Sequence, residues 1–170
     1  MAISDNLNKS TPTNFSLVFP IIPTETKISD MKPLVLNIFG TIIPALTLDQ
    51  TEQKWQGSRM QFHSGIAIFD DWTISFIVDS KFENWILLYK WLTFINNNED
   101  IPSKIVKDYM VDASLNITDN YGSRVLSIMF KNVWIQSLGE VTLSYRDGEN
   151  LIECSATFKI DRYEIIEPTT

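Results

Sequence analysis

Two adjacent carboxylates, Asp70 and Asp71, are the residues of this sequence whose type and spacing could do chemistry. They stand between the apolar run 65–69 and Trp72, and two carboxylates aimed at one bond can act as an acid–base pair. The residues that follow alternate as in a β-strand, and neighbours in a strand point to opposite faces. We therefore interpret both as the polar start of a strand and predict no catalytic dyad.

The other reactive side chains occur singly. His63 is the only histidine and Cys154 the only cysteine, which excludes an internal disulfide and a zinc site with several cysteines. No P-loop, dinucleotide-binding or serine-hydrolase motif is present. We predict no catalytic residue, no cofactor and no metal, and hence no enzyme. A monomeric barrel that binds a small ligand or acts as an enzyme is the competing interpretation.

The net charge of −7 disfavours a protein that grips nucleic acid, which needs clustered lysine and arginine. Residues 1–13 are polar, lack the apolar core of a signal peptide and predict a flexible N-terminal arm. The most apolar stretch, 85–95, is too short to span a bilayer, which takes about 20 residues. We expect one domain over residues 14–170, in a protein that is intracellular when made and not inserted into a membrane.

The first half of the chain has a β-rich pattern. Segments 15–22 and 33–46 have the composition of strands, and Pro20 indicates an edge or an end of the first. Residues 47–62 are polar and predict an extended hairpin or a long loop. In the next segment alternate residues share one apolar face, which predicts a strand with a buried side; these are Trp72, Ile74, Phe76 and Val78.

One helix is predicted over residues 81–95. Ser80 and Glu83 have the spacing of a capping box, in which each side chain satisfies a free backbone N–H. Apolar residues repeat on two helical faces; the first comprises Phe82, Trp85, Ile86, Tyr89 and Leu92, and the second Leu87, Leu88, Trp91 and Phe94. Since a surface helix of a monomer needs one apolar face, we expect a neighbouring molecule to cover the second.

The C-terminal half has an all-β pattern. Strands near 111–118 and 124–134 flank the turn cluster 119–123. A long hairpin over 140–165 is predicted to turn at Asp147-Gly148, a favoured turn pair. In its second strand one face is apolar and consists of Ile152, Cys154, Ala156, Phe158 and Ile160.

Several segments occur in a characteristic order: Phe69-Asp70-Asp71-Trp72 opening a strand, the Trp-rich helix, "KIVKDYMVDASLNI", the stretch from Val133 to Tyr145, and a final "FKIDRYEI". Over about residues 14–166 this order resembles the tail tube proteins of contractile-tailed bacteriophages. Many members carry proline where this chain has Ile135. The resemblance implies a mainly β fold, a β-sandwich or half-barrel with one packed helix at about 81–95, whose six copies form a continuous inner β-barrel ring.

The resemblance also implies a function. The chain is expected to be a structural virion protein that self-assembles into stacked hexameric rings, the inner tail tube through which DNA passes during genome ejection. The implied partners are further copies of itself, the contractile sheath, the tape-measure protein, and baseplate and tail-terminator proteins, without stable nucleic-acid binding. The implied location is the phage tail, assembled in the host cytoplasm. The alternative is a baseplate tube-initiator or a tube subunit of a related contractile injection particle.

Three groups of site residues follow from this resemblance. The subunit interface is expected to include Asp70, Asp71, Leu87, Leu88, Trp91 and Phe94. Segment 47–62 corresponds to a ring-stacking loop, with Gln53, Trp55 and Arg59 as its contact residues. Polar positions expected to face the lumen are Thr142, Ser144, Ser155, Thr157 and Asp161. An acidic lumen would repel phosphate, so that DNA slides through.

Overall fold

The structure is a computed structural model that describes residues 13–19, 31–96, 109–144 and 150–167, except for the side chain of Trp55. The predicted Asp147-Gly148 turn, and the predicted arm apart from Thr13, lie outside these residues. The described part is mainly β, as predicted. Its elements are β1 (Phe15–Val18), α1 (Lys32–Val35), β2 (Ile38–Thr41), β3 (Leu46–Trp55), β4 (Ser58–Phe69), β5 (Trp72–Ile77), α2 (Glu83–Asn96), β6 (Val111–Thr118), β7 (Arg124–Leu138), β8 (Glu153–Lys159) and β9 (Arg162–Ile166).

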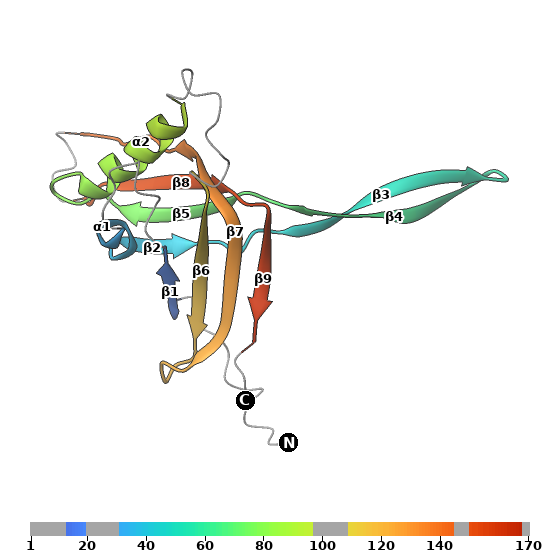
Figure 1. The fold of residues 1–170 in the computed structure, drawn as a ribbon, viewed down its shortest axis with the longest axis horizontal. Helices are drawn as coiled ribbons and strands as arrows, with labels where there is room; N and C mark the ends of the chain where they lie inside the picture. Colours follow the sequence, from blue (N-terminus) through green and yellow to red (C-terminus); the bar gives the residue numbers. More distant parts are fainter. Residues whose placement is uncertain (1–12, 20–30, 97–108, 145–149, 168–170) are drawn as a thin grey trace.

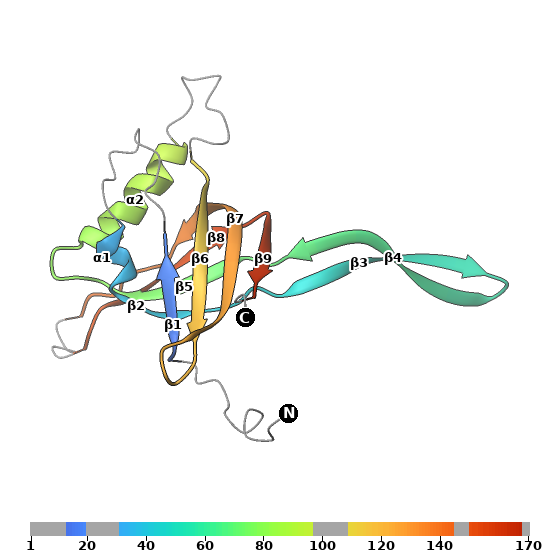
Figure 2. The ribbon, with the colours of Figure 1, turned by 60° about the horizontal axis from the view of Figure 1, so that its bottom comes forward.

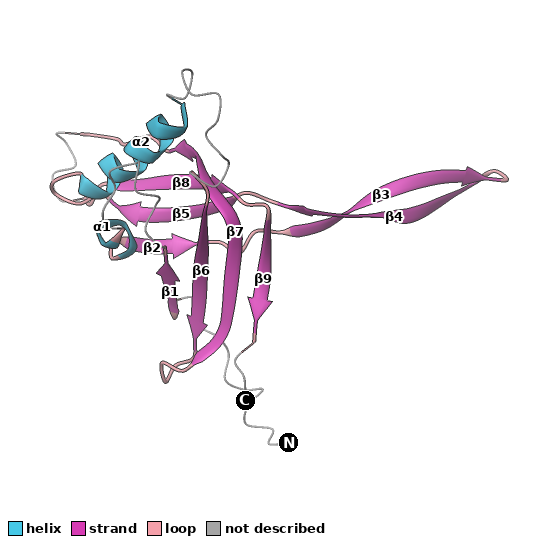
Figure 3. Cartoon of the chain, in the orientation of Figure 1, coloured by secondary structure: helices cyan, strands magenta, loops and turns pink. Residues whose placement is uncertain are grey.

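Strand β7 belongs to two sheets and joins them. Its residues 124–133 pair with β6 and its residues 127–131 also pair with β9, whereas 134–138 pair with β8. The strand order is β1-β6-β7-β8-β5-β2, with β9 as a branch on β7. Figures 1 and 3 show β2, β5 and β8 running across the direction of β6, β7 and β9. This arrangement encloses a core as a half-barrel does.

The bend of β7 between its two sheets lies at Asn132. This residue has a φ of 55°, in the left-handed region that asparagine adopts more readily than most residues. Its N–H donates to Asp112 Oδ1 at 3.1 Å, and its side-chain Nδ2 donates to Asp161 Oδ2 at 2.5 Å. Two carboxylates from neighbouring strands and turns therefore hold the bend in place.

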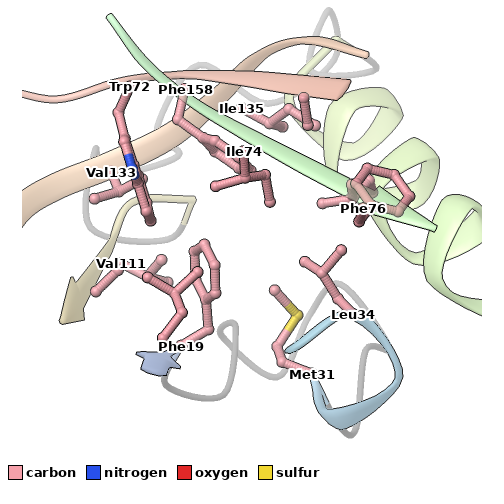
Figure 4. Close-up of a cluster of buried hydrophobic side chains, with 14 of the residues drawn as sticks. Phe19, Met31, Leu34, Trp72, Ile74, Phe76, Val111, Val133, Ile135 and Phe158 are labelled. Atoms are coloured by element: carbon pink, nitrogen blue, oxygen red, sulfur yellow. The ribbon is translucent and has the colours of Figure 1, made fainter. Parts of the chain in front are cut away.

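The core lies between the two sheets and is rich in aromatic side chains (Figure 4). Trp72, Ile74 and Phe76 on β5 have no exposed surface, which confirms the predicted apolar face of that strand. The apolar face of β8 is likewise buried and pairs with them in register, Trp72 opposite Phe158. Helix α2 packs against β7 and α1 at one end of this core.

Helix α2 begins at Glu83, and Asp79 caps it rather than the predicted Ser80. Asp79 Oδ1 accepts hydrogen bonds from the N–H groups of Lys81 and Glu83, at 3.0 and 2.9 Å. Phe82, with a φ of 58°, is not helical, so the first turn starts two residues later than the sequence predicts. A carboxylate at this position also stabilises the positive end of the helix dipole.

Asn84 ties the start of α2 to the end of β5. Its side chain is fully buried, its Nδ2 donates to the carbonyl of Ile77 at 2.7 Å, and its Oδ1 accepts from the N–H of Trp85 at 2.8 Å. We expect Asn84→Ala to lower the free energy of unfolding by about 2 kcal/mol, because a buried carbonyl loses its donor. Urea denaturation measures this. Asn96→Ala, exposed at the far end of α2, is the control and should change stability by less than about 0.5 kcal/mol.

Two predicted strands differ from the observed elements. Residues 32–35 form the short helix α1, which replaces the start of the expected strand 33–46, because Pro33 suits a first helical turn and Leu34 buries its side chain. The expected long hairpin over 140–165 is not formed: residues 139–144 and 150–152 contain no strand, and β8 pairs with β5 and β7. Strand β9 pairs instead with β7.

Candidate functional site

Strands β3 and β4 form a hairpin that extends away from both sheets (Figures 1 and 2). Its turn, Gln56-Gly57, has positive φ at both residues, 46° and 82°, the conformation of a type I′ turn. The register shifts between Leu48 and Gln50, near Gly65 with a φ of 80°. The extended hairpin predicted for 47–62 is therefore confirmed, and it is longer than expected. We call residues 50–63, beyond the register shift, the distal hairpin.

The distal hairpin has one apolar and one polar face. Met60 and Phe62 lie on the first face and are about half exposed, 48% and 49%. Residues of the polar face pair across the strands as Gln50–His63, Glu52–Gln61 and Lys54–Arg59. An isolated two-stranded hairpin is only marginally stable in water. Exposed apolar side chains on a projecting hairpin indicate a surface for contact with another molecule.

The three residues predicted for ring stacking all lie on this hairpin. Gln53 pairs with Met60 and shares its face, whereas Arg59 lies on the polar face near the turn. The side chain of Trp55 lies outside the described part of the structure. Sequence reasoning missed Met60 and Phe62, although their alternation with Gln61 and His63 is the period-two signal of a strand.

A second candidate surface is the outward face of β5, β8 and the end of β7. Thr73 pairs with Thr157, Ser75 with Ser155, and Thr157 also with Ser137 across β7. We call these five residues, Thr73, Ser75, Ser137, Ser155 and Thr157, the hydroxyl face. Their side chains are small and uncharged, and they lie on the side of the sheet opposite the aromatic core.

Two of the five predicted lumen residues, Ser155 and Thr157, belong to the hydroxyl face. Thr142 and Ser144 are exposed but lie in 139–144, which has no strand and gives them no register with that face. Asp161 lies in the turn between β8 and β9 and binds Asn132. The sequence pattern could not show that Thr142 and Ser144 lie outside the hydroxyl face, because residues 140–144 alternate as a strand would.

Gly139 lets β7 and β8 approach closely beside the hydroxyl face. A Cβ at Gly139 would lie 2.7 Å from Ser155 Oγ and 2.8 Å from its carbonyl oxygen, and the Gly139 N–H already donates to that oxygen at 2.7 Å. We expect Gly139→Ala to lower the free energy of unfolding by about 2 kcal/mol, since the backbone must move apart. At Gly40 a Cβ would meet the Ser75 side chain at ordinary contact distances, Cβ at 3.6 Å and Oγ at 4.0 Å. Gly40→Ala is therefore the matched control, expected to be nearly neutral in the same urea titration.

Asp70 and Asp71 do not converge. The Asp70 side chain is exposed and its N–H donates to the carbonyl of Ala45 at 3.1 Å, closing the base of the hairpin. Asp71 forms an ion pair with Lys159 across the sheet, with 2.5 Å between Oδ1 and Nζ. Such a half-exposed pair stabilises a protein by at most about 1 kcal/mol. The interpretation of these residues as a strand start agrees with this geometry.

The helix residues predicted for the subunit interface need correction. Leu88 and Trp91 have no exposed surface and Leu87 is 7% exposed, so the chain's own core covers them. Trp91 Nε1 donates to the carbonyl of Tyr109 at 3.0 Å. The exposed apolar side chains of α2 are on the other predicted face, Ile86 at 39% and Tyr89 at 49%. Phe94 is half-buried.

Asp112 and Cys154 each have a pKa that is shifted by their surroundings. Burial alone would raise the pKa of Asp112, but the Lys131 ammonium at 2.6 Å and the Asn132 N–H together hold it below its usual value. Burial raises the pKa of the Cys154 thiol, which is the state of an inert buried cysteine. Within residues 13–19, 31–96, 109–144 and 150–167, no three metal-binding side chains gather. No helix there has the length and hydropathy to cross a bilayer.

Known proteins resemble this chain over nearly its whole length. The family model described as phage tail tube protein matches residues 10–166. The tail tube terminator protein of Enterobacteria phage T4 is 26% identical over 172 residues, covering 96% of this chain and 93% of that protein.

Two solved structures share the fold at low sequence identity. A chain of the anti-feeding prophage cap, described as a tube terminating cap, has a TM-score of 0.66 at 16% identity, covering 99% and 100% of the two chains. A chain of the sheath–tube complex of an extracellular contractile injection system in its extended state has a TM-score of 0.65 at 13% identity, covering 99% of each chain. At this identity the likeness concerns the fold.

Proposed function

Because the chain belongs to the phage tail tube protein family, we propose that it assembles into a ring of six copies around a lumen and that this ring terminates a contractile tail tube. A tail tube or tube terminator protein is structural, and the chain is not an enzyme. The place at the end of the tube rests on one observation, the 26% identity to a tail tube terminator across nearly all of both chains.

Ring closure would use the two free edges of the sheet that carries the hydroxyl face. Strand β2 pairs only with β5 among the described residues, and residues 134–138 of β7 pair only with β8. An open edge presents unpaired N–H and C=O groups that another chain can complete. Pairing of β2 in one copy with 134–138 in the next would continue the sheet around the ring and form the inner barrel.

In such a barrel the hydroxyl face would line the lumen. It carries no cation, and at one end Lys159 is neutralised by Asp71. DNA binds proteins mainly through lysine and arginine contacts to phosphate. A wall of serine and threonine in an acidic protein would therefore let DNA pass without holding it. A tape-measure protein would meet the same wall before DNA does.

The remaining exposed surfaces would serve other contacts. The apolar face of the distal hairpin, with Met60 and Phe62, would pack against a neighbouring copy. Ile86 and Tyr89 are exposed on the face of α2 opposite Leu88 and Trp91, which the core covers, so they would face outward in the ring. We assign them to the sheath or to the proteins at the end of the tail. This replaces the contact predicted for Leu87, Leu88 and Trp91.

Electron microscopy of the purified protein tests the proposal. A terminator is expected to form rings of six that stay short when concentrated, and to stop elongation when added to growing tubes of its partner tube protein. Open-ended tubes of this chain alone would instead make it the main tube subunit, the second candidate, which the description of the family model favours. A strictly monomeric protein at high concentration that leaves tube growth unchanged would contradict both.

A further inference from the structure

Trp134 lies on the same side of the sheet as the hydroxyl face. Its neighbours Val133 and Ile135 are buried in the core, so the Trp134 side chain points to the opposite side. It pairs with Lys159 of β8, which shares a face with Thr157. Trp134 is half-buried, and unlike the three other tryptophans whose side chains are described, it packs neither in nor against the core. A large aromatic side chain therefore interrupts a wall of small hydroxyl-bearing residues.

The row of residues across the sheet from Trp134 carries no net charge. Lys159, directly opposite, forms an ion pair with Asp71, with 2.5 Å between Nζ and Oδ1. Proteins that bind single-stranded nucleic acid combine aromatic platforms with cations that follow the phosphates. This row has an aromatic side chain, and its one cation is already neutralised. The adjacent hydroxyls of Ser137 and Thr157 can donate to and accept from a peptide backbone. The row therefore suits an uncharged polypeptide better than a phosphate chain.

A second apolar side chain lies on the other free edge of this sheet. Ile42 directly follows β2 and is 51% exposed, and its N–H donates to the carbonyl of Thr73 at 3.3 Å. Thr41 faces the core, where its Oγ1 accepts a hydrogen bond from Trp72 Nε1, so the next residue, Ile42, continues on the side of the hydroxyl face. Because β2 of one copy would adjoin β7 of the next in the proposed ring, Ile42 and Trp134 of adjoining copies would meet at the same seam.

We propose that Trp134, together with Ile42 of the adjoining copy, is a docking site in the lumen for an uncharged polypeptide segment with an apolar face. The site rests on the proposed ring and deepens it, because it assigns a binding residue to the protein that the ring encloses. Glu153 pairs with Ile77 at the opposite end of β5, so the two ends of the lumen wall differ in chemistry. The enclosed polypeptide is held at the Trp134 end, and DNA that follows it finds no free cation there.

Peptide binding to assembled rings tests the site. The probe is a fluorescein-labelled helical peptide of leucine, alanine and glutamine with capped ends, and its control peptide has serine in place of every leucine. In fluorescence anisotropy the leucine peptide should bind wild-type rings at least about tenfold more tightly than the serine peptide, since leucine side chains bury apolar surface against Trp134. Trp134→Gln should remove this difference, and Trp134→Phe should keep most of it. Tyr121→Gln removes an exposed aromatic side chain in the turn between β6 and β7, and this matched control should bind as wild type does.

Electron microscopy shows whether each variant still forms rings. We expect Trp134→Gln to form rings that have lost the preference for the leucine peptide. Loss of rings in Trp134→Gln would overturn the site, because Trp134 would then serve the contact between copies. Equal binding of the two peptides by wild-type rings would overturn it too, as would binding of single-stranded oligothymidine that depends on Trp134. Each of these results leaves the proposed function intact, whereas a wild type that forms no rings contradicts the proposed function and the site with it.

Discussion

Trp72→Ala is expected to lower the free energy of unfolding by about 3–5 kcal/mol, the range for removing a large buried aromatic side chain. Trp72 lies where the two sheets meet, and its ring stacks on Phe130 of β7 at 4.4 Å between centroids. It also contacts Phe19 at 5.5 Å and Phe158 of β8 at 5.4 Å. The cavity that Trp72→Ala leaves would therefore lie between the two sheets, where no single side chain can fill it.

The measurement is urea denaturation at one fixed protein concentration, because assembly raises apparent stability by mass action. A loss of this size corresponds to a melting temperature roughly 10 °C lower for a chain of this length. Trp72→Phe keeps the aromatic contacts and loses the hydrogen bond from Nε1 to Thr41 Oγ1 at 2.9 Å. It should cost about 1–2 kcal/mol. Equal losses in the two variants would show that stacking between the sheets contributes little.

The role of Trp72 in the core could be predicted from the sequence, because the alternation along 72–76 has one physical cause. A strand with one buried face must place every second side chain in the core. The same holds for Cys154, Ala156 and Phe158 on β8, all buried as predicted. Sequence period alone thus located two of the three strands whose polar sides form the hydroxyl face, β5 and β8.

The contacts of α2 could not be predicted in the same way. Helical spacing identified two apolar faces but contains no information on which one lies inside, and the inner one proved to be that of Leu88 and Trp91. The capping residue was missed for a related reason. Phe82 takes a positive φ, which moves the first turn along the chain and makes Asp79 the acceptor. Whether Phe82 adopts a positive φ depends on packing against residues far away in the sequence, which the local residue spacing does not reveal.

Replacing residues 50–63 by Asn-Gly is expected to weaken assembly while leaving the fold intact. The distal hairpin projects away from both sheets in Figures 1 and 2, so its removal takes no side chain out of the core. The free energy of unfolding of the monomer should change by less than about 1 kcal/mol. Assembly should weaken at least about tenfold, because Met60 and Phe62 are about half exposed, and burying the remaining surface of each is worth roughly half of the 1.5–3 kcal/mol for a fully buried side chain.

Single substitutions on the two faces of the hairpin separate this contact from a general loss of hairpin structure. Phe62→Ser removes an apolar side chain from the face that we assign to a neighbouring copy, and should weaken assembly by about tenfold or more. His63→Ser, one residue along and on the opposite face, is the matched control and should assemble as wild type does. Sedimentation of both at equal concentration gives the comparison. If the shortened chain forms rings as readily as wild type, the hairpin is no part of the ring contact, and closure depends on the sheet edges alone.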